Sequence, residues 1–242
     1  MVNRPGWAVF SFSLAFAFKL QAVFLLPFLI VFALRKKISW LFYILVPVVY
    51  FISVLPTILV GRPMMDAFLI YAQQTDKFPK WSSTTPTMYL PLQGRIELTP
   101  VLSMLTVFLA GLIVLVWVYY AWKKRENDTS ASILMTALSS VALVPFILPR
   151  MHQRYFYPQD ILTLLLAIFF PKFWFLPVFS QIISLLAYSP FLFNITPRVQ
   201  LFGRNLNAIL YVALPLELLL LVISLWMQFR HSIAAERVSF GK

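Results

Sequence analysis

Long, continuous apolar runs separated by short polar stretches dominate the chain. A typical run reads LFYILVPVVYFISVLPTILV, and its residues do not alternate between apolar and polar as the strands of a membrane β-barrel would. A helix needs roughly 20 apolar residues to cross a bilayer. The pattern therefore predicts about eight membrane segments, which we place at residues 7–18, 21–34, 39–60, 99–122, 131–148, 159–170, 173–193 and 206–228.

The predicted fold class is all-α: residues 1–242 form a single transmembrane domain, a polytopic helical bundle in which some segments are short or broken. The first and sixth segments are short for a full span at roughly 1.5 Å per residue, so we expect re-entrant or broken helices there. Prolines inside the apolar runs are expected to kink their helices and to open a cavity. These prolines are Pro27, Pro47, Pro56, Pro145, Pro177 and Pro215.

Composition supports a bilayer as the solvent of this chain. Hydrophobic residues make up 61% of it and charged residues only 12%, about half the usual charged share of a soluble domain. The net charge of +12 could indicate nucleic acid, but the cations punctuate the apolar runs instead of forming one stripe. We therefore expect a lipid bilayer and no nucleic acid as partner. The sequence has no cysteine, which excludes disulfides and cysteine-based metal sites.

The densest basic clusters predict the orientation. The clusters at 35–37 and 123–125 lie at segment ends, and helix parity places them on one side together with the tail at 229–242. The positive-inside rule makes that side cytoplasmic. The opposite, extracytoplasmic side then carries a long loop at 61–98, which begins with an amphipathic segment, and a polar loop at 149–160.

The outer face should be poor in cations under the same rule, yet many lie there. They are Lys19, Arg62, Lys77, Lys80, Arg95, Arg150, Arg154, Arg198 and Arg204. An extracytoplasmic cavity that binds an anion would explain them.

The most polar stretch between two apolar segments is LPRMHQRYFYPQDIL, at residues 148–162. Arg150 and Arg154 are four residues apart, so one helical turn would place both guanidinium groups on one face, where they could grip a phosphate. Both cations are expected to lower the pKa of His152 between them. The aromatic residues that follow would anchor the loop at headgroup level, and Asp160 would cap the next helix. The alternative is an interfacial loop whose arginines snorkel to the lipid surface.

Three more charged residues are candidates. Lys19 interrupts two apolar stretches, where it either snorkels from a helix end or contacts a phosphate on the outer face. Glu217 lies inside the last segment, where a carboxylate either pairs with an arginine of the bundle or stays protonated. Asp66 is either the cap of an interfacial helix or a general base or metal ligand. The sequence contains no metal-binding or nucleotide-binding motif, so we predict no metal and no cofactor.

Three stretches together, FKLQAVFLLPFLI, GRPMMDAFLIYAQQ and LPRMHQRYFYPQDIL, resemble integral-membrane glycosyltransferases of the GT-C fold, in particular the bacterial relatives of the PIG-V and PIG-M type mannosyltransferases. The resemblance covers most of the chain, and the MH-x-RYF-x-P-x-D loop is its most specific part. It implies a multi-pass protein of the bacterial inner or plasma membrane. The implied reaction transfers a sugar, with mannose expected, from a polyprenyl-phosphate donor to an extracytoplasmic acceptor, which is a glycan, a lipid or a protein.

The resemblance also implies roles for particular residues. The donor phosphate would contact Lys19, Arg150 and Arg154. Further substrate-site candidates are His152, Gln153, Tyr155 and Asp160, followed by Asp66 and Glu217. Gln153 stands where family members commonly have a glutamate, and an amide cannot replace a carboxylate in acid–base chemistry.

A second departure concerns the catalytic base. In this class the base usually lies in the first extracytoplasmic loop, but no acidic residue precedes Asp66. The chain is therefore expected to resemble the C-terminal part of such an enzyme, to be inactive alone, and to need an upstream half or a partner chain. This leaves the catalytic residue unassigned.

Two other functions share the same chemistry. A flippase or transporter of lipid-linked sugars would also need a cationic cavity and kinked helices, but the chain shows no related halves. A polymerase or ligase of surface polysaccharide would also use extracytoplasmic arginines, on an undecaprenyl-diphosphate substrate.

Overall fold

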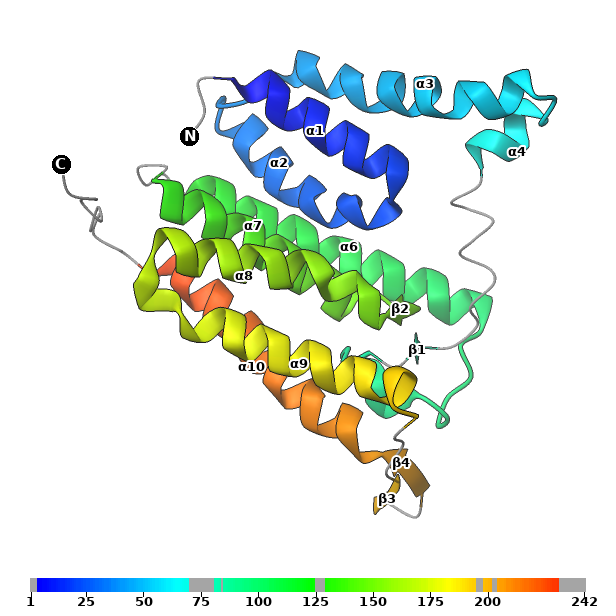
Figure 1. The fold of residues 1–242 in the computed structure, drawn as a ribbon, viewed down its shortest axis with the longest axis vertical. Helices are drawn as coiled ribbons and strands as arrows, with labels where there is room; N and C mark the ends of the chain where they lie inside the picture. Colours follow the sequence, from blue (N-terminus) through cyan, green and yellow to red (C-terminus); the bar gives the residue numbers. More distant parts are fainter. Residues whose placement is uncertain are drawn as a thin grey trace. The chain divides into compact units, whose positions relative to one another are not determined.

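The structure, a computed structural model, is all-α over most of its length (Figure 1). It describes residues 4–69, 81–83, 85–124, 129–194, 198–201 and 204–230. The chain forms two compact units, one made of Met1–Pro79 and Val116–Lys123 and the other of Lys80–Leu115 and Lys124–Lys242. The expectation of a single transmembrane domain stays a prediction.

The first unit is built from the N-terminal helices. They are α1 (Pro5–Phe18), α2 (Leu26–Leu34), α3 (Leu45–Leu59) and the short α4 (Met64–Phe68). A 3₁₀ helix precedes α2 at Leu20–Leu25 and another precedes α3 at Trp40–Ile44. Helix α1 packs against α3, where the ring of Phe16 contacts that of Tyr50, and Val9 and Phe12 of α1 are buried.

The second unit carries the longer helices. They are most of α6 (Pro100–Lys123), α7 (Ser130–Ile147), α8 (Tyr157–Phe169), α9 (Phe175–Leu192) and α10 (Ala208–Phe229). Four short strands complete it: β1 (Ser82–Ser83), β2 (Met151–His152), β3 (Arg198–Leu201) and β4 (Arg204–Asn207). Helix α7 packs against α8 and α10, and α9 packs against the same two helices. Almost every residue of α7 is buried, so α7 forms the core of this unit.

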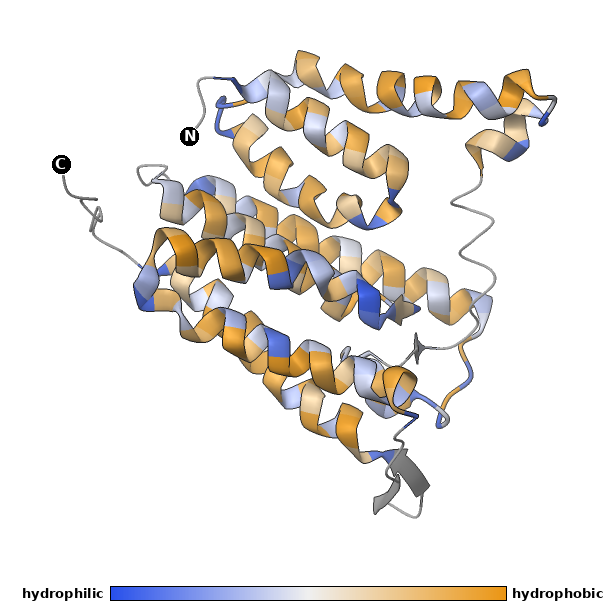
Figure 2. Ribbon diagram, in the orientation of Figure 1, coloured by the Kyte–Doolittle hydropathy of each residue, from blue (hydrophilic) through white to orange (hydrophobic). Residues whose placement is uncertain are grey.

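Each predicted membrane segment coincides with helical backbone, and apolar residues cover most of the length of these helices (Figure 2). Among the described residues, five helical stretches are long and apolar enough to cross a membrane: Trp40–Leu59, Pro100–Lys123, Ser130–Ile147, Pro171–Leu192 and Ala208–Phe229. The first and sixth segments are short, as predicted, because α1 has 14 residues and α8 has 13.

The prolines divide into two groups. Those inside helices, as predicted, are Pro56, Pro145 and Pro215. Those in the first turn of a helix are Pro27, Pro47 and Pro177. In the first turn the missing N–H removes no helical hydrogen bond, so the second group begins helices and does not interrupt them. The kinks expected at the six prolines stay a prediction.

The predicted basic end of the first unit joins two helix ends. The Arg35 guanidinium donates a hydrogen bond to the carbonyl of Ala121 at the end of α6. The indole of Trp122 donates to the carbonyl of Leu34 over 3.2 Å. The end of α2 and the end of α6 therefore lie side by side.

Lys124 makes the corresponding contact in the second unit. Its ammonium donates to the carbonyl of Gln228 and, over 3.3 Å, to that of Arg230. Within each unit, the described basic residues therefore contact the end of a second helix. That the basic clusters share one side stays a prediction. The cytoplasmic placement of these ends stays a prediction, and the tail from 231 to 242 lies outside the described residues.

Candidate functional site

Two loops that are distant in the sequence meet at one end of the second unit. Strand β1 pairs in parallel with β2, with Ser82 opposite Met151 (Figure 1). The backbone N–H of Arg150 donates to the carbonyl of Trp81 over 2.8 Å, and the Thr85 hydroxyl donates to the carbonyl of Met151 over 3.2 Å. The second half of the 61–98 loop therefore holds the backbone of the loop at 149–160, which we call the motif loop.

Trp81 anchors this second half of the loop. Its indole donates to the carbonyl of Ile96, and its ring stacks on Tyr89 with centroids 5.4 Å apart. The N–H of Met88 donates to the carbonyl of Phe146 over 3.2 Å, which ties the loop to the end of α7. We call this part of the loop, residues 81–96, the platform. The sequence did not predict it because its contacts join residues far apart in the chain.

The two arginines of the motif loop do not share one helical turn, which corrects the sequence prediction. Arg150 has φ of 62°, in the left-handed region, and β2 after it is extended. A 3₁₀ helix at Gln153–Phe156 then carries Arg154. The pairing with β1 keeps Met151 and His152 extended instead of helical. Along the chain, Arg150 therefore precedes this extended dipeptide and Arg154 follows it.

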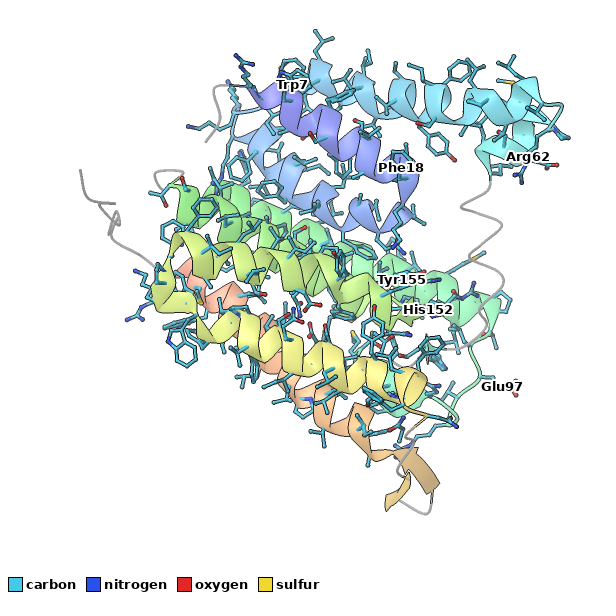
Figure 3. All side chains as sticks on the ribbon, viewed as in Figure 1. Trp7, Phe18, Arg62, Glu97, His152 and Tyr155 are labelled. Atoms are coloured by element: carbon cyan, nitrogen blue, oxygen red, sulfur yellow. The ribbon has the colours of Figure 1, made fainter. Side chains whose placement is uncertain are left out.

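His152 lies between the two arginines in the chain. Burial is the main cause that lowers its pKa, and the Arg154 charge lowers it further. The predicted direction is thus confirmed, although burial is the larger cause. Its ring meets Tyr155 edge to face at 5.5 Å, and Figure 3 shows these two side chains next to one another. The Arg154 guanidinium lies 5.9 Å from the centre of the Tyr155 ring. This end of the unit therefore combines fixed cations with an imidazole that is neutral at pH 7.

Asp160 does not cap α8, contrary to the prediction. It lies in the first turn of α8, where Phe156 occupies the cap position. Its carboxylate accepts hydrogen bonds from Ser180 over 2.6 Å and from Ser184 over 2.7 Å. Both serines belong to α9, so Asp160 connects α8 to α9.

Glu217 has an amide as its hydrogen-bond partner, not an arginine. The side chain of Gln159 donates to Glu217 Oε2 over 3.0 Å, and this bond joins α8 to α10. Glu217 is 0% exposed and Gln159 is 1% exposed. The sequence indicated Glu217 as a buried carboxylate but gave no signal for Gln159, because a glutamine at a helix start is common on exposed surfaces.

The other predicted residues belong to the first unit or to the loop itself. Lys19 ends α1 and Asp66 lies in the first turn of α4, and both are exposed. The motif loop belongs to the second unit, which also holds the half-buried Gln153 at the start of its 3₁₀ helix. In the described part of the chain, no three histidine, aspartate or glutamate side chains gather as a metal site would require.

The fold and the site define an α-helical membrane protein whose second unit carries a cationic loop, the buried Glu217 and the half-buried Asp160. Comparisons with protein-family models, with curated proteins and with solved structures found no match.

Proposed function

We propose that the motif loop binds the phosphate of a polyprenyl-phosphate-linked sugar, with mannose expected, and that the chain is a membrane glycosyltransferase or the donor-binding part of one. The observation that supports this most is the fixed backbone of the loop. Its pairing with β1 and the bond from the Arg150 N–H to Trp81 fix the backbone from Arg150 to His152, directly before the turn that carries Arg154. A preorganised cationic loop is what an anionic leaving group needs.

The chemistry of the loop suits a lipid phosphate. Guanidinium groups bind phosphate through paired, charge-assisted hydrogen bonds and keep their charge at every physiological pH. Arg150 is half-buried and Arg154 is exposed, so one can hold the phosphate from below while the other meets it from the solvent side. Both would stabilise the charge that develops on the phosphate as the glycosidic bond breaks.

Substitution of the loop arginines tests the proposal. The full chain in nanodiscs is titrated with a polyprenyl monophosphate while its tryptophan fluorescence is recorded. We expect Arg150→Gln and Arg154→Gln each to weaken binding about 10- to 100-fold, because each removes a charged hydrogen bond worth about 1.5–3 kcal/mol.

Arg62→Gln is the matched control. Arg62 is also exposed and predicted to be extracytoplasmic, but it belongs to the first unit. Its substitution removes the same charge and should leave the affinity within about twofold. Equal effects of all three substitutions would indicate general attraction of anions, and unchanged affinity in the loop variants would support the snorkelling alternative.

A further inference from the structure

A second polar cluster lies inside the helices of the second unit. Glu217 occupies the middle of α10 and Gln159 the first turn of α8, and neither is used by the proposed donor site. Both side chains are fully enclosed, and one hydrogen bond from the amide of Gln159 to Glu217 Oε2 joins them. An ionised carboxylate inside a membrane costs free energy, so it matters whether Glu217 is ionised or protonated.

One atom on each side chain has no hydrogen-bond partner: Oε1 of Glu217 and Oε1 of Gln159. With an ionised Glu217, both of these atoms are acceptors and neither can satisfy the other. A proton on Glu217 Oε1 makes this oxygen a donor. Gln159 Oε1, on the side chain already bonded to Glu217, is an unsatisfied acceptor of the kind that such a donor requires.

Helices α7 to α10 themselves offer no cation to neutralise an ionised Glu217. The 3₁₀ helix Gln153–Phe156, which packs against α7, α8 and α9, carries Arg154, whose side chain is exposed. Helices α7, α8, α9 and α10 contain no lysine, arginine or histidine. Their ionisable side chains besides Glu217 are Tyr157, Asp160, Tyr188 and Tyr211. A buried charge without a partner costs roughly several kcal/mol. Binding of a proton by Glu217 removes this charge and therefore its cost.

Asp160 is the other carboxylate of helices α7 to α10, and it follows Gln159 directly in the chain. Its two hydrogen bonds from Ser180 and Ser184 stabilise the ionised carboxylate. Two neighbouring carboxylates do not both ionise readily, so a negative Asp160 favours the neutral form of Glu217. Asp160 is only half-buried and lies at the loop end of α8, so it is the carboxylate of the four helices with access to solvent.

We propose that Glu217 and Gln159 form a proton-binding site within the helices of the second unit, with Asp160 as its ionised neighbour. The ligand is a single proton, held on Glu217 at neutral pH and exchangeable with water on the side of Asp160. Carboxylates that hold protons in this way are the elements of proton paths in membrane proteins.

Infrared difference spectroscopy of the full chain in nanodiscs tests this site. At neutral pH we expect a carbonyl stretch of a protonated carboxylic acid, which shifts when the sample is moved into D₂O. Glu217→Gln should abolish the band, because the amide keeps the shape of the side chain but carries no acid proton. Glu97→Gln, at an exposed carboxylate outside these helices, is the matched control and should leave the band in place.

Other outcomes would overturn the proposal. A band that survives in Glu217→Gln but disappears in Asp160→Asn would assign the proton to Asp160. A band that appears only after sodium is removed would show that the site binds a sodium ion in place of the proton. A band that does not respond to D₂O would mark a sealed structural acid, and the absence of any band would show an ionised Glu217. None of these results depends on donor binding by the loop.

Discussion

Arg150 has a backbone conformation that its own side chain disfavours. A non-glycine residue in the left-handed region persists only when its surroundings impose it, at a cost of order 1–3 kcal/mol. The imposing contacts are the hydrogen bond from its N–H to Trp81 and the pairing of β2 with β1. Strain of this kind often occurs in ligand-binding loops, which agrees with a role for Arg150 in holding an anion.

His152 should titrate below the ordinary histidine value of 6.5, because burial and the Arg154 charge both favour its neutral form. It therefore stays neutral at pH 7 and gains a charge only in more acidic solution. Nuclear magnetic resonance of the imidazole signals measures this midpoint, and the chain has only two histidines to assign. Arg154→Gln should raise the midpoint without restoring 6.5, since burial remains.

His152→Gln identifies the signal by removing it. A midpoint at or above 6.5 in the unaltered chain would contradict the described environment of His152, as would a midpoint in Arg154→Gln that does not move.

The contact between α8 and α9 depends on two serine hydroxyls around one carboxylate. The double substitution Ser180→Ala and Ser184→Ala leaves Asp160 half-buried without these donors. We expect it to lower the free energy of unfolding by about 1–3 kcal/mol, since hydrogen bonds to charged groups are the stronger ones. Thermal unfolding of the chain in detergent measures the loss.

Ser189→Ala is the control for this element. Ser189 lies on the same helix, but its hydroxyl donates to the backbone carbonyl of Leu186 one turn earlier. It should cost less than about 1 kcal/mol. Equal losses for the control and the double variant would show that Asp160 contributes nothing specific to the packing of α8 on α9.

The helices themselves could be predicted from the sequence because each apolar run is a local signal. The runs at 99–122 and 131–148 correspond to α6 and α7 to within a residue or so at each end. The pairing of β1 with β2 could not be predicted, because two-residue strands leave no pattern. The role of Asp160 was missed for a related reason, since its partners lie on another helix and nothing near it in the chain indicates them.

For the whole molecule, composition and apolar length predicted an α-helical membrane protein. The part of the chain that the structure describes supports this with five helices long enough to cross a membrane. The division into two units was not predicted, because it depends on which helices pack together. The candidate site was predicted in part: the loop was located correctly, but the platform at 81–96 and the pairing of Gln159 with Glu217 come from contacts across the chain.

Photo-crosslinking tests the central claim that the motif loop holds a lipid-linked phosphate. A polyprenyl phosphate with a photoreactive group beside the phosphate is added to the full chain in nanodiscs, and labelled peptides are identified by mass spectrometry. We predict label on residues 148–162 and on the 81–96 platform, removed by excess unlabelled polyprenyl phosphate and reduced in a chain carrying both Arg150→Gln and Arg154→Gln. Label confined to the exposed faces of α3 and α6, and insensitive to competitor and substitutions, would contradict it.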